Sequence, residues 1–400
     1  MKHSTKVLLL AALCAMPALA SAVTYTYRVP AKLLVGAGNT GAGGAGAGGP
    51  PPYVPIASLL TDSYYSNLLG FIRTDGTFWV SGYNNGAFGN GTTPNSNVYV
   101  KVADDVISAS AATQTIILKS DGTLMGTGYN TQNQLGTGNT TAPVSFIPLL
   151  TNVRFASANM YGTLAVKNDN TLWQAGQQYY RTPATGMAYY SYPTFTQVGS
   201  NVQMAVNGAY HIARILTDGT LQTLGECAGN VDGFYTSDGT WQTAPFNNVI
   251  DVKVYRFSLA LTADGSVWAG GINMNGEFGD GSANAPTTYY CKPWRKVATG
   301  VRAIYMESSA NGPISFLVKM DNSLWASGNN QYGQMGNGTT TSTSTFQQVF
   351  TDVASISGGY SFSMVKRLDG TIWVAGRNTY GAFGDGTNSQ SLTWKQLSNP

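Results

Sequence analysis

Short apolar runs, each followed by a tight polar turn, repeat along most of the chain. The run LLGFIRT (68–74), for example, is followed by Asp75-Gly76 and then by a second run, TFWVSG (77–82). Two strand-like runs joined by Asp-Gly predict a β-hairpin. We expect a type I′ turn, in which both central residues have positive φ.

This hairpin recurs seven times with the pattern Asp-Gly-Thr-x-Trp-x-x-Gly, in which several positions vary. The aspartates lie 46 to 57 residues apart, a period typical of propellers and solenoids. Two copies have Asn in place of the first Gly, and Asn also tolerates positive φ. We therefore interpret the aspartates as turn residues and not as metal ligands or acids. They are Asp75, Asp121, Asp169, Asp218, Asp264, Asp321 and Asp369.

Further features recur within each copy. A large side chain, usually Trp, stands four positions after the aspartate, and we expect it to pack between adjacent repeats. Gly stands seven positions after every aspartate, where the missing side chain lets backbone pass close by. Five copies continue into a loop that ends in an apolar residue and Gly-x-Gly, and this apolar residue is expected to anchor the loop on the core. A last β-rich stretch, such as VYVKV (98–102), closes each copy.

Each repeat thus supplies about four short strands, as a propeller blade requires. We predict an all-β fold, a seven-bladed β-propeller over residues 53–400 with about four short antiparallel strands per blade. Closing the ring removes exposed sheet edges. We expect residues 54–60 to close it by pairing with the last strand, residues 393–397.

The N-terminal residues have the pattern of an export signal. Lys2 and Lys6 flank the start of an apolar run (7–13), and small residues suited to cleavage follow. We predict a signal peptide over 1–22, cleavage near Ala22, and a secreted or periplasmic, cell-envelope location. Residues 23–52 form an N-terminal segment and a Gly/Pro-rich linker. Whether residues 23–35 form a strand or a docking peptide stays open.

Charge argues against several classes of partner. Loss of Lys2 and Lys6 leaves 20 basic residues (22 − 2) against 19 acidic ones, a net charge of +1. This balance provides no basic surface for nucleic acid or for anionic membranes. The apolar run is too short to span a bilayer. We expect a monomer with no transmembrane segment after cleavage.

Catalytic side chains are scarce. His211 is the one histidine left after cleavage, and it lies in a strand-like run, so we interpret it as a packing residue. The motifs G-x-S-x-G, H-E-x-x-H and C-x-x-C are all missing from the sequence. We predict a protein that is not an enzyme and uses no cofactor and no metal. A carboxylate pair across the ring, as in a glycosidase, stays open as an alternative.

Two cysteines are left in the exported chain. Cys227 and Cys291 lie in the tails of neighbouring repeats. In an oxidising compartment they either form a disulfide or stay as two thiols.

The order of hairpin, Asp-Gly-Thr-x-Trp-x-x-Gly, Gly-x-Gly loop and closing strand resembles the regulator-of-chromosome-condensation repeat. The resemblance covers residues 56–400, and seven copies is the blade number of that family. The family includes a nuclear nucleotide-exchange factor that binds chromatin. It also includes secreted bacterial propellers, one group of which inhibits β-lactamases. The export signal and the missing basic tail separate this chain from the nuclear branch, so nucleotide exchange is not carried over.

The repeat pattern fails in units three to five, where aromatic residues accumulate. QQYYRTPATGMAYYSYP (177–193) replaces the loop of unit three, ECAGNVDGFYTSDGTW (226–241) replaces that of unit four, and unit five has a longer tail. Tyr-rich loops on a rigid scaffold are typical of protein-binding surfaces. The predicted partner-binding residues are Tyr179, Tyr180, Arg181, Tyr189, Tyr190, Tyr192, Phe234, Tyr235, Trp241, Tyr289 and Tyr290.

We therefore predict a secreted or envelope-associated module that binds a protein partner, in an interaction or inhibitor-like role, through blades three to five. A carbohydrate-binding or glycan-cleaving propeller is one alternative, and a structural surface repeat is a second. Drift of unused loops would produce the same departures from the repeat.

Overall fold

The computed structural model describes seven stretches of the chain, with side chains everywhere except at 61–62, 180–182 and 186–188. The chain divides into two units, Met1–Gly41 and Ala42–Pro400, and all described residues belong to the second. The predicted signal peptide (1–22) and linker (23–52) lie outside the described residues, so their boundaries stay predictions. The described stretches are 54–62, 67–182, 186–208, 211–225, 240–283, 291–307 and 312–398.

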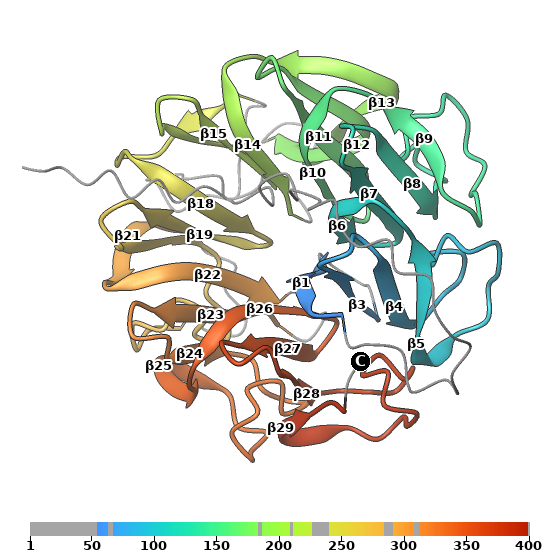
Figure 1. The fold of residues 1–400 in the computed structure, drawn as a ribbon. Helices are drawn as coiled ribbons and strands as arrows, with labels where there is room; N and C mark the ends of the chain where they lie inside the picture. Colours follow the sequence, from blue (N-terminus) through green and yellow to red (C-terminus); the bar gives the residue numbers. More distant parts are fainter. Residues whose placement is uncertain are drawn as a thin grey trace, which may run out of the picture. The chain divides into compact units, whose positions relative to one another are not determined.

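Every regular element in these stretches is a β-strand, and the strands form the seven blades of a propeller (Figure 1). Blades one to four contain β1 (Ile56–Leu59), β3 (Leu68–Arg73), β4 (Phe78–Gly82) and β5 (Ser96–Ala103); β6 (Val106–Ala111), β7 (Gln114–Lys119), β8 (Leu124–Gly128) and β9 (Ile147–Leu150); β10 (Val153–Ala158), β11 (Gly162–Lys167), β12 (Leu172–Thr182) and β13 (Gly186–Gly199); and β14 (Val202–Asn207), β15 (His211–Leu216), β16 (Leu221–Gly225) and β17 (Gln242–Thr243). Blades five to seven contain β18 (Val249–Val254), β19 (Phe257–Thr262), β20 (Val267–Gly271) and β21 (Lys292–Ala298); β22 (Val301–Glu307), β23 (Ile314–Lys319), β24 (Leu324–Gly328) and β25 (Thr343–Phe350); and β26 (Val353–Gly359), β27 (Phe362–Arg367), β28 (Ile372–Gly376) and β29 (Ser391–Gln396). The predicted fold class is confirmed.

The first strand of each blade lies toward the middle of the ring and the last strand lies at the periphery (Figure 1). Blade two has one strand more than the others. The short strand β2 (Thr61–Asp62) pairs in parallel with β6, with Thr61 opposite Ser110. The chain therefore crosses from blade one to the inner edge of blade two before it returns to build β3.

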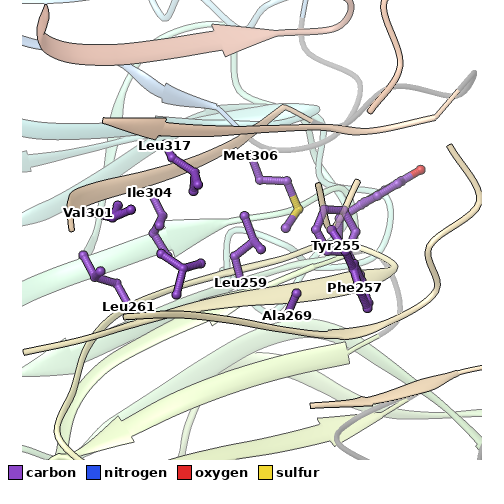
Figure 2. Close-up of a cluster of buried hydrophobic side chains, with 11 residues drawn as sticks. Tyr255, Phe257, Leu259, Leu261, Ala269, Val301, Ile304, Met306 and Leu317 are labelled. Atoms are coloured by element: carbon purple, nitrogen blue, oxygen red, sulfur yellow. The ribbon is translucent and has the colours of Figure 1, made fainter. Parts of the chain in front are cut away.

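The second strand of each blade is buried on both faces, because a neighbouring blade covers each side. In β19 every residue is buried. Leu259 and Leu261 pack toward blade six, in the cluster of Figure 2, whereas Ala260 packs in the cluster shared with blade four. Successive side chains of a strand point to opposite faces. This explains why these strands have continuous apolar runs in place of an alternating pattern.

The Asp turns differ from the predicted type I′ geometry. Only the residue after each aspartate, Gly76 for example, has positive φ, and the aspartates are not among the described positive-φ residues. The Gly76 N–H donates to the Arg73 carbonyl, and the Arg73 N–H donates to the Thr77 carbonyl. This is a three-residue hairpin loop, a turn followed by a left-handed Gly that forms a bulge. The same pair of hydrogen bonds occurs in all seven blades.

The aspartates have the structural role that we predicted for them. The Asp75 carboxylate accepts the Thr77 N–H at 2.9 Å and the Thr77 hydroxyl at 2.7 Å. Each of the other six aspartates accepts the N–H two residues later in the same way. These hydrogen bonds lower the pKa of turn aspartates such as Asp169, whose hydroxyl and N–H partners belong to Thr171.

The recurrent Trp packs between blades, although it is half-buried and not a fully buried plug. Trp79 packs against the cluster shared by blades one and seven, and Trp173 against that of blades two and three. The Trp79 indole N–H donates to the Thr77 hydroxyl at 2.9 Å. The residue before each Trp, such as Phe78, is the fully buried one.

The invariant Gly has the role that the sequence predicts. All seven of these residues have positive φ. At Gly376, where φ is 102°, a Cβ atom would lie 2.5 Å from the Ser361 carbonyl oxygen of the neighbouring hairpin turn. A side chain at this position would therefore collide with backbone.

A buried Asn organises each of the five Gly-x-Gly loops. In the first loop the Asn84 Oδ1 accepts the Phe88 N–H at 2.9 Å, and the Asn84 Nδ2 donates to carbonyls on the far side of the loop. Phe88 is buried in the core, as predicted for the apolar loop residue. We call these five loops, which begin at Asn84, Asn130, Asn273, Asn330 and Asn378, the interblade loops.

Each of these five interblade loops connects its own blade to the next, and one of them closes the ring. Their tips form single β-bridges with the outer strand of the following blade: Asn90 with Ser145, Thr137 with Thr194, Asp280 with Thr345, Asn337 with Thr393, and Asp385 with Val98. The last of these bridges joins blade seven to blade one.

The predicted pairing of residues 54–60 with 393–397 is wrong. β1 pairs with β3, and β29 pairs with β28, so each terminal strand stays within its own blade. Between these blades the Ser81 hydroxyl donates to the Ala382 carbonyl at 2.6 Å, and the shared cluster buries Phe71 against Phe362. Side-chain packing and a loop close this ring, because every blade already has its full set of strands.

Candidate functional site

The outstanding departure from the repeat is an extended β-ribbon on blade three. In the other described blades the third strand ends at the invariant Gly, but β12 continues past Gly176 to Thr182 and pairs with β13. The sequence predicted an irregular loop here. Tyr and Thr favour the extended backbone, and the hydrogen-bonded ladder from Gly176 opposite Tyr192 to Thr182 opposite Gly186 gives these residues a defined register.

The ribbon presents tyrosines on its two faces. Tyr179 lies opposite Tyr189, with ring centroids 5.5 Å apart. Tyr190 and Tyr192 lie on the other face, 6.5 Å apart, because neighbouring residues of a strand point to opposite sides. Tyr189 is 53% exposed and Tyr190 is 40% exposed. We call the four described residues Tyr179, Tyr189, Tyr190 and Tyr192 the tyrosine ribbon.

The base of the ribbon is held by the propeller. The Gln177 N–H donates to the Tyr161 carbonyl at 2.8 Å, and the Tyr179 hydroxyl donates to Gln177 Oε1 at 2.8 Å. The Tyr161 ring packs on that of Tyr179 at 4.5 Å. Sequence reasoning missed Tyr161, because it belongs to the β10–β11 turn, far from the substituted loop. Burial raises the pKa of Tyr192, with Tyr190 adding to the shift.

Not all predicted site residues can be placed. The strands at Tyr180 and Arg181 are described but their side chains are not, and Phe234, Tyr235, Tyr289 and Tyr290 lie outside the described residues. Their contribution to a binding surface stays a prediction.

Trp241 has a packing role in the described structure. Its ring is half-buried, packs against the cluster between blades three and four, and has the Arg214 guanidinium 3.9 Å from its centroid. In blade four Gln222 occupies the position that Trp has in most blades. Whether Trp241 also contacts a partner stays a prediction.

The junctions on both sides of blade four have no interblade bridge among the described residues. At the junction with blade five, Phe246 stacks on Trp268 at 4.5 Å and meets Trp294 edge-on at 5.2 Å. Pro293 stands where the other outer strands form the bridge. Cys291, nearby, is buried and disulfide-bonded. Cys227, its predicted partner, lies outside the described residues, so that pairing stays a prediction.

His211 and the aspartates of two interblade loops are engaged in structural contacts. His211 is buried, and its Nε2 lies 3.0 Å from the Ser258 hydroxyl. Burial lowers the pKa of His211 to about 4, so the ring is neutral at pH 7. Asp280 accepts the Ser282 N–H and the Arg295 guanidinium, and Asp385 likewise binds Thr387 and Lys395. Within the described stretches no three His, Cys, Asp or Glu side chains gather as metal ligands.

The described part of the chain also holds no helix that is long and apolar enough to cross a membrane.

Comparison with known protein families identifies one of these repeats. Residues 321–365, which run from the Asp321 turn of blade six into blade seven, match the regulator of chromosome condensation (RCC1) repeat. A comparison with curated proteins finds no match.

Several solved structures have a similar fold. One is yeast RCC1 (Prp20) bound to Kap60, with 14% identity over 86% of this chain and 85% of that chain and a TM-score of 0.68. A second structure, of Prp20p from Saccharomyces cerevisiae, gives 13% identity over 86% and 87% and a TM-score of 0.68. Human WBSCR16 gives 17% identity over 82% and 94% and a TM-score of 0.66. At these identities the likeness concerns the fold alone. Together with the matched repeat and the seven sheets, it identifies this chain as a seven-bladed β-propeller that carries the RCC1 repeat.

Proposed function

We propose that this chain is an exported module that binds a protein partner, and that the tyrosine ribbon is a main part of the binding surface. The observation that carries the proposal is the exposure of Tyr189 and Tyr190 on a ribbon with a fixed backbone. Tyrosine supplies a large, rigid contact area at low entropic cost, and it is enriched among residues that dominate binding energy.

The position of the ribbon supports the same proposal. Blade three has the ribbon in place of the loop that would otherwise bridge to blade four. A segment released from ring closure is available for contacts with another molecule. In proteins of the same fold the scaffold meets protein partners: yeast Prp20 has been seen bound to Kap60, and Prp20p has been described with its binding properties to Gsp1p and histones.

The paired variant Tyr189→Ala/Tyr190→Ala tests the ribbon. Both rings are exposed, so their loss leaves the core intact. The control, Tyr129→Ala/Met320→Ala, removes two comparably exposed side chains from blades two and six. We expect a partner crosslinked and purified from envelope or culture medium to bind the ribbon variant at least about thirtyfold more weakly, as the loss of a 2 kcal/mol hot spot implies. The control should bind like the parent.

Two results would contradict the proposal. Equal affinity of the parent and the ribbon variant for the purified partner would remove the ribbon from the site. Binding to glycans on an array, lost in the ribbon variant and without a protein partner, would favour the carbohydrate alternative.

Export is a separate part of the proposal, supported by the signal-like N-terminus. We expect the mature protein to begin near Val23 and to be recovered outside the cytoplasm, which N-terminal sequencing of fractionated cells measures. A cytoplasmic protein that retains Met1 would contradict it.

A further inference from the structure

A second aromatic surface lies on blades six, seven and one, away from the tyrosine ribbon. Its centre is the start of the interblade loop of blade seven. Arg377 lies there with the Tyr332 ring at 5.4 Å and the Tyr360 ring at 5.8 Å from its guanidinium carbon. Three residues further along the same loop, the Tyr380 ring packs at 5.2 Å against that of Tyr83 from blade one. We call these five residues the arginine–tyrosine surface.

The guanidinium of Arg377 is held in place but is not neutralised. Its Nε donates to the Thr379 hydroxyl at 2.9 Å. Its two Nη atoms make no hydrogen bond or ion pair within the described residues, whereas Arg295 and Arg367 each bind an aspartate. Two tyrosine rings, those of Tyr332 and Tyr360, lie within about 6 Å of the guanidinium carbon, the range of a cation–π contact. The two Nη groups therefore form a preorganised donor pair beside exposed aromatic side chains.

Blade seven positions Tyr360 in the turn between β26 and β27. Ser361, the next residue, is buried and has a φ of 72°, which is uncommon for a residue other than Gly. The Ser361 carbonyl accepts the Arg377 N–H at 2.9 Å, and the Ser361 backbone lies near the carboxylate of Glu307, which is buried at the end of β22. Strained backbone persists only where its surroundings hold it, and it concentrates at functional sites. One strained turn, near buried Glu307, thus connects Tyr360 with Arg377.

We propose that the arginine–tyrosine surface binds a carboxylate-bearing segment of a partner protein. The charge of the surface comes from Arg377 alone, so an acidic group complements it. A carboxylate accepts two parallel hydrogen bonds from a guanidinium fork. Tyr83 is 40% exposed and Tyr380 is 36% exposed, so they offer apolar area beside the charge, a combination that is enriched in protein interfaces. This surface lies apart from the tyrosine ribbon, so the inference goes beyond the proposed function.

The test uses the mature full-length propeller and defined probes. We expect a poly(Glu,Tyr) copolymer to bind in biolayer interferometry and to weaken as salt rises. Arg377→Gln should weaken binding at least about tenfold, the effect of losing a charge-assisted hydrogen bond. Tyr380→Ala should also weaken it. Arg367→Gln, which removes an already paired arginine of the same blade, and Tyr129→Ala, the counterpart of Tyr83 in blade two, should bind like the parent.

The named controls separate this surface from the ribbon and from misfolding. Tyr189→Ala/Tyr190→Ala should leave copolymer binding unchanged, and loss of binding there would overturn the assignment to Arg377. Equal binding by the parent and by a folded Arg377→Gln variant would also overturn it. Polygalacturonate that binds more tightly than the copolymer, with the same dependence on Arg377, would assign the surface to acidic glycans and overturn a protein partner.

Discussion

Acidification should destabilise this propeller through one buried histidine. His211 is buried between blades four and five, where Ser258 is its hydrogen-bond partner. The Nδ1 atom has no hydrogen-bond partner among the described residues. A second ring proton would therefore be buried without an acceptor. Burial lowers the pKa of His211 from its ordinary value of 6.5 to about 4.

The sign and the size of the effect follow from this shift. A histidine with a lowered folded pKa stabilises the fold fully above pH 6.5, and this stabilisation is lost as the pH falls toward 4. Each pKa unit corresponds to about 1.4 kcal/mol, so the contribution falls by about 2 kcal/mol at pH 5 and about 3 kcal/mol at pH 4. Burial acts in the opposite direction on Glu307 and Asp251, whose pKa values are raised. The total pH dependence therefore does not isolate His211.

A comparison with His211→Gln isolates it, because Gln does not titrate. Urea unfolding of both proteins between pH 7.5 and 4 gives two free-energy curves, measured where unfolding is reversible. We expect the parent to lose about 3 kcal/mol relative to the variant over this range, with most of the loss below pH 6.5. Parallel curves would refute the reasoning, even if both proteins lost stability in acid.

Three other perturbations have defined outcomes. Gly376→Ala should lower the free energy of unfolding by about 3 kcal/mol, because a Cβ there would meet the Ser361 carbonyl. Gly370→Ala should lower it by only about 1 kcal/mol, because Gly370 has positive φ but open space around it. Equal losses of the two variants in urea unfolding would contradict the clash. Glu307→Gln should raise the urea midpoint at pH 7, because burial raises the pKa of this carboxyl and its ionisation therefore destabilises the fold. The gain should shrink as the pH falls toward 4.5, and a gain that does not change with pH would contradict this role of the carboxylate. Asn130→Ala should lower the free energy of unfolding by about 1–3 kcal/mol and speed proteolysis of its loop, because buried backbone groups of the loop lose their hydrogen-bond partner. An unchanged rate of cleavage would contradict the role of Asn130 in organising the loop.

Local features were predictable because they depend on a few neighbouring residues. The Asp-Gly and Asp-Asn pairs mark the seven hairpins, and Gly82 and its six counterparts mark positions where backbone passes close by, so the blade number and the turn role of the aspartates follow directly from the sequence. The turn type did not follow. A left-handed Gly suits both the type I′ turn and the bulged loop, and only the pairing of Arg73 with Thr77 separates them.

Other features depend on residues that are far apart in the chain. Val98 meets Asp385, and Tyr83 meets Tyr380, only because the ring brings the first and last blades together. The tyrosine ribbon is intermediate: its tyrosines were visible in the sequence, but the ladder between Tyr179 and Tyr189 was not. The sequence alone determined the repeated unit and its turns, because these arise from local backbone preferences. The tertiary structure decided how the ring closes and which side chains share a surface, because these depend on which blades become neighbours.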